Sequence, residues 1–260
     1  MKKIIITIAI VAQFITNAME PNTETQVSRS SNPVIKPYAL RFAAKAFYNA
    51  DSLVAIIIPD DVQIIYANCF ENCINLRSVH FSSESCLTKI QSEAFYNCRS
   101  LTSIVIPSSV KIIGGGCFGY CTDLKEVFFA EGSKLRHISE RAFSGCSSLV
   151  SISIPDGVKV LGEWCFESCS SLENVNFGLD SQLTDILWGA FYNCTSLVSV
   201  SIPDDVQTLH TWSFLDCTCL KNVSFKNLFT SVKEDAFMGC LLSKYTQFAL
   251  KFHYEFPTEK

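Results

Sequence analysis

The chain has 260 residues, of which 48% are hydrophobic and 18% charged, and its formal net charge is -4. This length and apolar content can build a sizeable core in one or two domains. The small negative charge gives no signal for nucleic acid or an anionic membrane as a partner. The thirteen cysteines are too sparse for a miniprotein built on disulfides.

Residues 1–18 have the features of a secretory signal peptide. Lys2 and Lys3 supply positive charge, Ile4–Ile15 is an apolar run, and Ala18 ends a group of small residues. The run is too short to span a membrane. We therefore expect cleavage after Ala18, export of the mature chain, and no transmembrane anchor after cleavage. The alternative is a buried N-terminal strand.

After a polar segment, predicted as an N-terminal tail and cap over residues 19–40, one pattern repeats along the chain. Phenylalanine recurs at intervals of 23 or 25 residues, giving a doublet of 48 residues. A period in this range is typical of a solenoid or a repeat array. We call these residues the ladder Phe: Phe47, Phe70, Phe95, Phe118, Phe143, Phe166, Phe191, Phe214 and Phe237.

Each unit has the same internal order. A Leu follows the ladder Phe by six residues, and two apolar residues spaced two apart then predict a short strand with one buried face. Proline ends this strand in alternate units. An apolar pair three apart follows and is predicted to lead into one tight helical turn before the next ladder Phe. Stacked coils bury such surface by pairing their strands in parallel, about 4.8 Å apart. We predict a solenoid of about nine repeats over residues 41–243, followed by a C-terminal cap or tail over 244–260.

The consensus LxxIxIPxxVxxIGxxCFxxC, seen for example in residues 101–121, resembles the BspA-like subclass of leucine-rich repeats, whose repeats have 23 residues. The resemblance implies a right-handed coil shaped as a horseshoe or arc. It has a parallel β-sheet on one face and short turns, helical turns or short strands on the other. The resemblance also implies a secreted or cell-surface protein that binds host or matrix proteins in adhesion.

Eleven cysteines occupy two positions of the repeat, one residue before and three residues after the ladder Phe. Other repeats have Ala or Ser there, as at Ala50 and Ser213, so both positions call for a small side chain and buried thiols fit them. Disulfides between adjacent coils and metal binding by the CxxxC pairs are the alternatives. Cys86 and Cys219 align with polar residues, and we expect them to be exposed free thiols or to form an intermolecular bridge.

Two groups of side chains are candidates for binding a partner. Outward-facing strand positions include His80 and Phe128, on a face that is otherwise small or polar towards the C-terminal end. Trp164 and Trp212 each precede a ladder Phe by two residues, where other repeats have polar side chains. Trp188 precedes the ladder Phe191 by three residues, and Tyr192 directly follows the same Phe. Clustered exposed tryptophans mark interaction sites, and the alternative is that each ring packs across the neighbouring turn.

Asn193 and Asn222 begin N-glycosylation motifs, which have meaning only in a eukaryotic secretory pathway. We predict no enzyme, cofactor or metal site, because the four His lie at unrelated phases of the repeat. We expect a secreted or surface-associated repeat protein that binds protein partners of unknown identity and no nucleic acid. An intracellular repeat scaffold with reduced cysteines, or a structural array without a ligand, are the alternatives.

Overall fold

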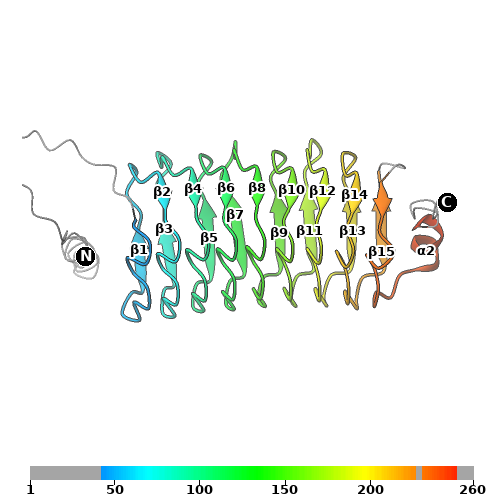
Figure 1. The fold of residues 1–260 in the computed structure, drawn as a ribbon, viewed down its shortest axis with the longest axis horizontal. Helices are drawn as coiled ribbons and strands as arrows, with labels where there is room; N and C mark the ends of the chain where they lie inside the picture. Colours follow the sequence, from blue (N-terminus) through cyan, green and yellow to red (C-terminus); the bar gives the residue numbers. More distant parts are fainter. Residues whose placement is uncertain (1–41, 227–229, 251–260) are drawn as a thin grey trace, which may run out of the picture.

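The computed structural model describes residues 42–226 and 230–250. The expected signal peptide (1–18) and N-terminal tail (19–40) lie outside the described residues. Figure 1 shows the described chain as a single row of stacked coils that runs from β1 at one end to the helix α2 at the other. One coil corresponds to one repeat, and we call it a rung.

Each rung contributes one long strand to the first side of the stack, the long-strand face. The alternating residues of these strands are buried and exposed in turn, as the period-two pattern predicted. The strands pair in parallel in the groups β1-β3, β5-β7-β9-β11 and β13-β15. They are β1 (Ala55–Ile57), β3 (Ser78–His80), β5 (Ser103–Ile106), β7 (Glu126–Phe129), β9 (Ser151–Ile154), β11 (Asn174–Phe177), β13 (Ser199–Ile202) and β15 (Asn222–Phe225).

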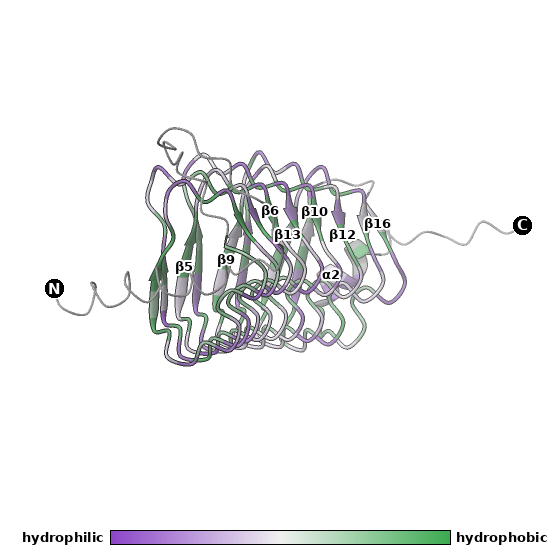
Figure 2. Cartoon of the chain, turned by 60° about the vertical axis from the view of Figure 1, so that its left-hand side comes forward, coloured by the Kyte–Doolittle hydropathy of each residue, from purple (hydrophilic) through white to green (hydrophobic). Residues whose placement is uncertain are grey.

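Each rung also adds a two-residue strand to a second parallel sheet of eight strands, on a different side of the coil (Figure 2). The short strands allowed by the family resemblance are present here, and the inner residue of each pair, such as Ile65 or Ile113, is buried from an extended backbone. Between this strand and the ladder Phe, where a helical turn was predicted, the chain forms hydrogen-bonded turns, such as the bond from the Cys69 N–H to the Tyr66 carbonyl. These strands are β2 (Ile64–Ile65), β4 (Lys89–Ile90), β6 (Ile112–Ile113), β8 (His137–Ile138), β10 (Val160–Leu161), β12 (Asp185–Ile186), β14 (Thr208–Leu209) and β16 (Ser231–Val232).

The third side, the turn face, carries the ladder Phe and the residues on either side of it. The ladder rings are buried and stack from rung to rung, with centroids 4.9–5.4 Å apart. The backbone N–H of Phe118 donates to the Ala142 carbonyl on the next rung at 2.7 Å, and Gly116 and Tyr120 donate to that rung in the same way. Both of these flanking residues have φ near +60°. The left-handed conformation of the residues two positions before and two positions after the Phe directs their N–H groups towards the next rung.

Where a ninth long strand would follow Phe237, the chain forms the helix α2 (Lys244–Leu250) instead. Thr246 is buried, and its hydroxyl donates to the Lys221 carbonyl at 3.1 Å. The same hydroxyl oxygen accepts a hydrogen bond from the N–H of Val223 in β15 at 3.3 Å. The helix therefore covers the last strand of the stack. None of the helices in the described part of the chain is long and apolar enough to cross a membrane.

Candidate functional sites

The outward residues of the long-strand face form straight rows, because the strands pair in register. One row begins with apolar and aromatic side chains: Val105 pairs directly with Phe128, and Ile57 pairs with His80. Ile57, Val105 and Phe128 are 56%, 53% and 51% exposed. From β9 onward the row continues with Ser153 and other small polar residues. The prediction that these positions point outward is confirmed.

A groove of about 600 Å³ adjoins Phe128 on this face. Its walls include the polar side chains of Glu126, Ser151 and Asn176, together with Gly178 at the end of β11. The Asp156 carboxylate occupies the space where a side chain on Gly178 would lie. The apolar row therefore borders a recess whose wall carries hydrogen-bonding groups.

The turn face carries a second recess, a cleft of about 300 Å³ with aromatic walls. The Trp164 ring meets the Tyr192 ring edge to face, with centroids 5.7 Å apart and an interplanar angle of 89°. It also lies 6.2 Å from the Trp212 ring, at 44°. Arg141, Glu167 and Leu215 complete the lining. We call this the aromatic cleft.

Gly189 explains how two tryptophans from rungs two apart come together. It occupies the same turn position on the rung between them, and a Cβ there would lie 2.2 Å from Cε3 of Trp164. Because Gly189 has no side chain, the Trp164 ring lies over it and reaches Trp212. The packing alternative therefore holds for Trp164, whose ring does pack across the neighbouring turn. Trp212 remains 36% exposed.

Both cleft tryptophans occupy backbone positions that disfavour large side chains. Their φ angles are +58° at Trp164 and +62° at Trp212, in the left-handed region. An L-residue in this region costs roughly 1–2 kcal/mol, which glycine avoids. Other repeats have Gly116 or Asn68 at this position. The fold itself therefore does not require tryptophan there.

Trp188 does not line the aromatic cleft. It precedes its ladder Phe by three residues rather than two, and it is 51% exposed. Its carbonyl accepts the N–H of Trp164 at 2.9 Å, so its backbone is adjacent although its ring lies outside the lining. The cluster expected from the sequence thus contains Trp164, Tyr192 and Trp212 without Trp188.

The eight cysteines that follow a ladder Phe by three residues form one hydrogen-bonded series. Each thiol donates to the carbonyl oxygen of the ladder Phe on the preceding rung, at 3.0–3.2 Å. Burial raises the pKa of Cys73 to about 11 and that of Cys121 to about 12. All thirteen cysteines are free in this structure. Protonated, buried thiols are poor nucleophiles, so this series has a packing role.

The remaining predicted residues lie apart from both recesses. Cys86 and Cys219 are exposed, as expected, and each is a free thiol. Asn222 is exposed at the start of β15, whereas the Asn193 side chain is partly buried and donates to the Ser168 hydroxyl at 3.1 Å. The structure thus gives the two glycosylation motifs different surroundings.

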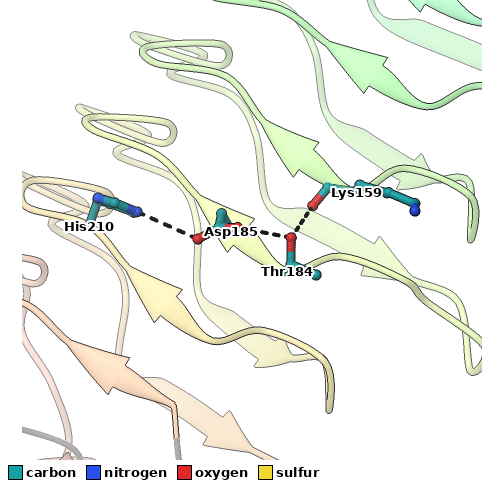
Figure 3. Close-up of polar contacts among 4 residues, drawn as sticks. All are labelled: Lys159, Thr184, Asp185 and His210. Atoms are coloured by element: carbon teal, nitrogen blue, oxygen red, sulfur yellow. Dashed lines mark hydrogen bonds and ion pairs between the residues drawn. The ribbon is translucent and has the colours of Figure 1, made fainter.

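One polar contact was not anticipated from the sequence. His210 Nε2 lies 3.6 Å from the Asp185 carboxylate on the side of the short strands (Figure 3). The Thr184 hydroxyl bonds to Asp185 at 2.8 Å and to the Lys159 carbonyl at 3.1 Å. The Thr184 hydroxyl donates to the Asp185 carboxylate and not to the His210 imidazole, so these side chains are not arranged as a hydroxyl activated by a histidine. Across residues 42–226 and 230–250, no three His, Cys, Asp or Glu side chains are grouped as metal ligands.

Two parallel sheets and an internal phenylalanine ladder, built from units of 23 or 25 residues, define a leucine-rich-repeat solenoid. The family model of the BspA type leucine rich repeat region matches residues 41–173 and 136–251, in six copies. The chain therefore belongs to the BspA type leucine-rich repeat family, which confirms the resemblance seen in its sequence.

Solved structures of bacterial leucine-rich repeat proteins are similar to this chain. The protein from Eubacterium ventriosum is 24% identical, with a TM-score of 0.54 over 74% of this chain and 44% of its own. The chain thus spans less than half of that protein. The T. pallidum protein is 25% identical, with a TM-score of 0.47 over 83% of this chain and 77% of its own. The Bacteroides ovatus protein is 21% identical, with a TM-score of 0.44 over 77% of this chain and 68% of its own. The search of curated proteins gave no match.

Proposed function

We propose that this chain is an exported, non-enzymatic binding protein that holds a partner protein on its long-strand face, in the manner of an adhesin. The observation that carries the proposal is the row of exposed apolar side chains on one side of the stack: Val105 and Phe128 on paired strands of one sheet, and Ile57 on the strand pair β1-β3 nearer the N-terminal end. His80 lies within the same row.

Rigid strands and an aromatic anchor suit this face to binding a partner. Val105 and Phe128 lie on strands that pair in register within the sheet β5-β7-β9-β11, so little conformational entropy is lost when a partner binds. Binding energy concentrates in a few large side chains at the centre of an interface, a role that suits Phe128. Glu126, Ser151 and Asn176 in the neighbouring groove would supply the polar rim.

Binding would be measured against a panel of purified extracellular-matrix proteins by biolayer interferometry. For any protein that binds, Val105→Ser and Phe128→Ser should each weaken binding at least about tenfold, or roughly 1.4 kcal/mol. Ser201→Ala and Ser224→Ala, on the polar half of the same row and outside the groove, are the matched controls. If the control pair weakens binding as much as the apolar pair does, the apolar row is not the binding surface.

Export is supported by the charged and apolar pattern of residues 1–18. The intracellular scaffold remains the second candidate, and the thirteen free cysteines favour it. Intact mass of the protein from its natural source, alkylated without reductant, distinguishes the two. Loss of residues 1–18 supports export. An unprocessed chain with thirteen alkylated thiols supports the scaffold.

A further inference from the structure

We propose that the aromatic cleft on the turn face is a carbohydrate site that binds pyranose rings of a neutral oligosaccharide. This site lies on a different side of the coil from the long-strand face and takes a different class of ligand. The proposal therefore stands independently of the protein-binding function.

The aromatic walls supply the apolar part of such recognition. One face of a pyranose presents C–H groups with partial positive charge, which are attracted to the negative face of an aromatic ring. The cleft offers three rings, of which Tyr192 and Trp212 lie 5.7 and 6.2 Å from the central Trp164 ring. The volume of about 300 Å³ is at the lower end for small-molecule sites, which suits one or two sugar rings.

The polar groups at the rim of the cleft supply the hydrogen-bonding part of sugar recognition. Within the described chain, the Arg141 guanidinium, the indole N–H groups of Trp164 and Trp212, and the Tyr192 hydroxyl make no hydrogen bond. Glu167 accepts a bond from the Ser144 hydroxyl at 3.1 Å and has acceptor capacity left. Sugar hydroxyls both donate and accept hydrogen bonds, so a sugar can pair with these donors and with the Glu167 carboxylate.

The two charges at the rim of the aromatic cleft have opposite signs and give no net attraction for a charged ligand. Arg141 and Glu167 both line the cleft, and no ion pair joins them in the described structure. A cation would be attracted by the carboxylate but repelled by the guanidinium, and the reverse holds for an anion, so the two effects offset each other. A neutral polyhydroxy ring is compatible with both groups.

A second recess on the turn face extends the site along the stack. It has about 270 Å³, shares Arg141 with the aromatic cleft, and contains Tyr96 and Tyr120, whose rings are 5.5 Å apart. From Tyr96 to Trp212 the distance is five rungs, or about 24 Å at the strand spacing. Two aromatic recesses joined by one arginine fit a linear oligosaccharide better than a single sugar.

The test titrates the folded chain with neutral tetrasaccharides of glucose, mannose and N-acetylglucosamine, up to about 10 mM, the range of weak affinities. Tryptophan fluorescence and saturation-transfer NMR report binding. At least one tetrasaccharide should bind. Trp164→Ala and Trp212→Ala should each lower the affinity for that tetrasaccharide at least about tenfold. Trp188→Ala is the matched control, because that exposed ring lies outside the cleft, and it should leave the affinity unchanged.

Arg141→Ala provides a second variant without loss of an aromatic ring. This variant should weaken binding of the tetrasaccharide more than binding of the corresponding monosaccharide, because Arg141 lines both recesses. The proposal is overturned if no neutral tetrasaccharide binds, or if only sulfated glycans or quaternary ammonium compounds do. Equal weakening by Trp188→Ala and Trp164→Ala would also overturn it. Circular dichroism of each variant confirms that the solenoid is intact.

Discussion

The thiol of Cys121 donates a hydrogen bond of 3.2 Å to the backbone carbonyl oxygen of Phe95, on the preceding rung. The same bond recurs at all eight cysteines of this position, so every ladder Phe from Phe47 to Phe214 accepts one thiol. A thiol is a weak donor, but it satisfies a carbonyl in a place too small for most polar side chains. The cysteines therefore combine packing with satisfaction of the buried backbone.

This arrangement predicts which thiols react in the folded protein. Cys86 and Cys219 are exposed, whereas the cysteines beside the ladder are buried and protonated. Brief treatment of the native chain with a maleimide at neutral pH should label these two first, because attack requires an accessible thiolate. Peptide mass spectrometry locates the label, and denatured protein, in which all thirteen thiols should react, is the control. Early labelling of Cys121 would contradict the buried assignment.

The same thiols predict a loss of stability at alkaline pH. Burial raises the pKa of Cys73 from 9.0 to about 11 and that of Cys121 from 9.0 to about 12. Above pH 9 the unfolded chain releases these protons while the folded chain keeps them, so the unfolded state binds fewer protons and stability falls as pH rises. The free energy of unfolding should be insensitive to these groups below pH 9 and should decline between pH 9 and about 12.

Urea denaturation at pH 7, 9 and 10.5 measures this decline. A variant with Cys73→Ala and Cys121→Ala should lose less stability between pH 9 and 10.5 than the parent chain, because it has two fewer buried thiols to titrate. Equal losses in the two proteins would show that other groups cause the alkaline effect.

Loss of a ladder ring should be far more damaging than loss of an equally large exposed ring. Phe118 is fully buried between Phe95 and Phe143, with centroids at 5.4 and 5.2 Å. Phe118→Ala should lower the free energy of unfolding by about 3–5 kcal/mol. Phe128→Ala removes the same side chain from the surface and should cost less than about 1 kcal/mol. Similar losses in urea denaturation would contradict the central role of the ladder.

The sequence predicted the interior well because every rung repeats the same environment. Phe118 and Cys121 are fully buried at the phase where the repeat places them. The two-residue strand Ile112–Ile113 was anticipated only through the family resemblance, because two adjacent apolar residues have no period that separates a strand from a turn. Its extended form depends on pairing with the neighbouring rungs.

The candidate sites were only partly predictable, because they depend on contacts between rungs. Alignment of the repeats placed Trp164 and Trp212 at one position, but their contact arises from the missing side chain of Gly189 between them. The contact of His210 with Asp185 could have been predicted once the short strands were placed in register. Asp185 pairs with Thr208, and His210 lies two residues farther along, on the same side of the strand.

Gly189 offers the most direct test of how the aromatic cleft is built. A Cβ on Gly189 would lie 2.2 Å from the Trp164 ring, whereas a Cβ on Gly132 would have no atom within 4 Å. Both glycines have positive φ, at +58° and +70°, so alanine at either position costs roughly 1–2 kcal/mol from the backbone alone. Gly189→Ala must also displace the Trp164 ring, which should add about 1–3 kcal/mol. Urea denaturation measures the difference between the two variants, and tryptophan emission should shift in Gly189→Ala alone. Equal stability losses with unchanged emission would mean that Trp164 does not rest on Gly189, and the contact between Trp164 and Trp212 would then need another cause.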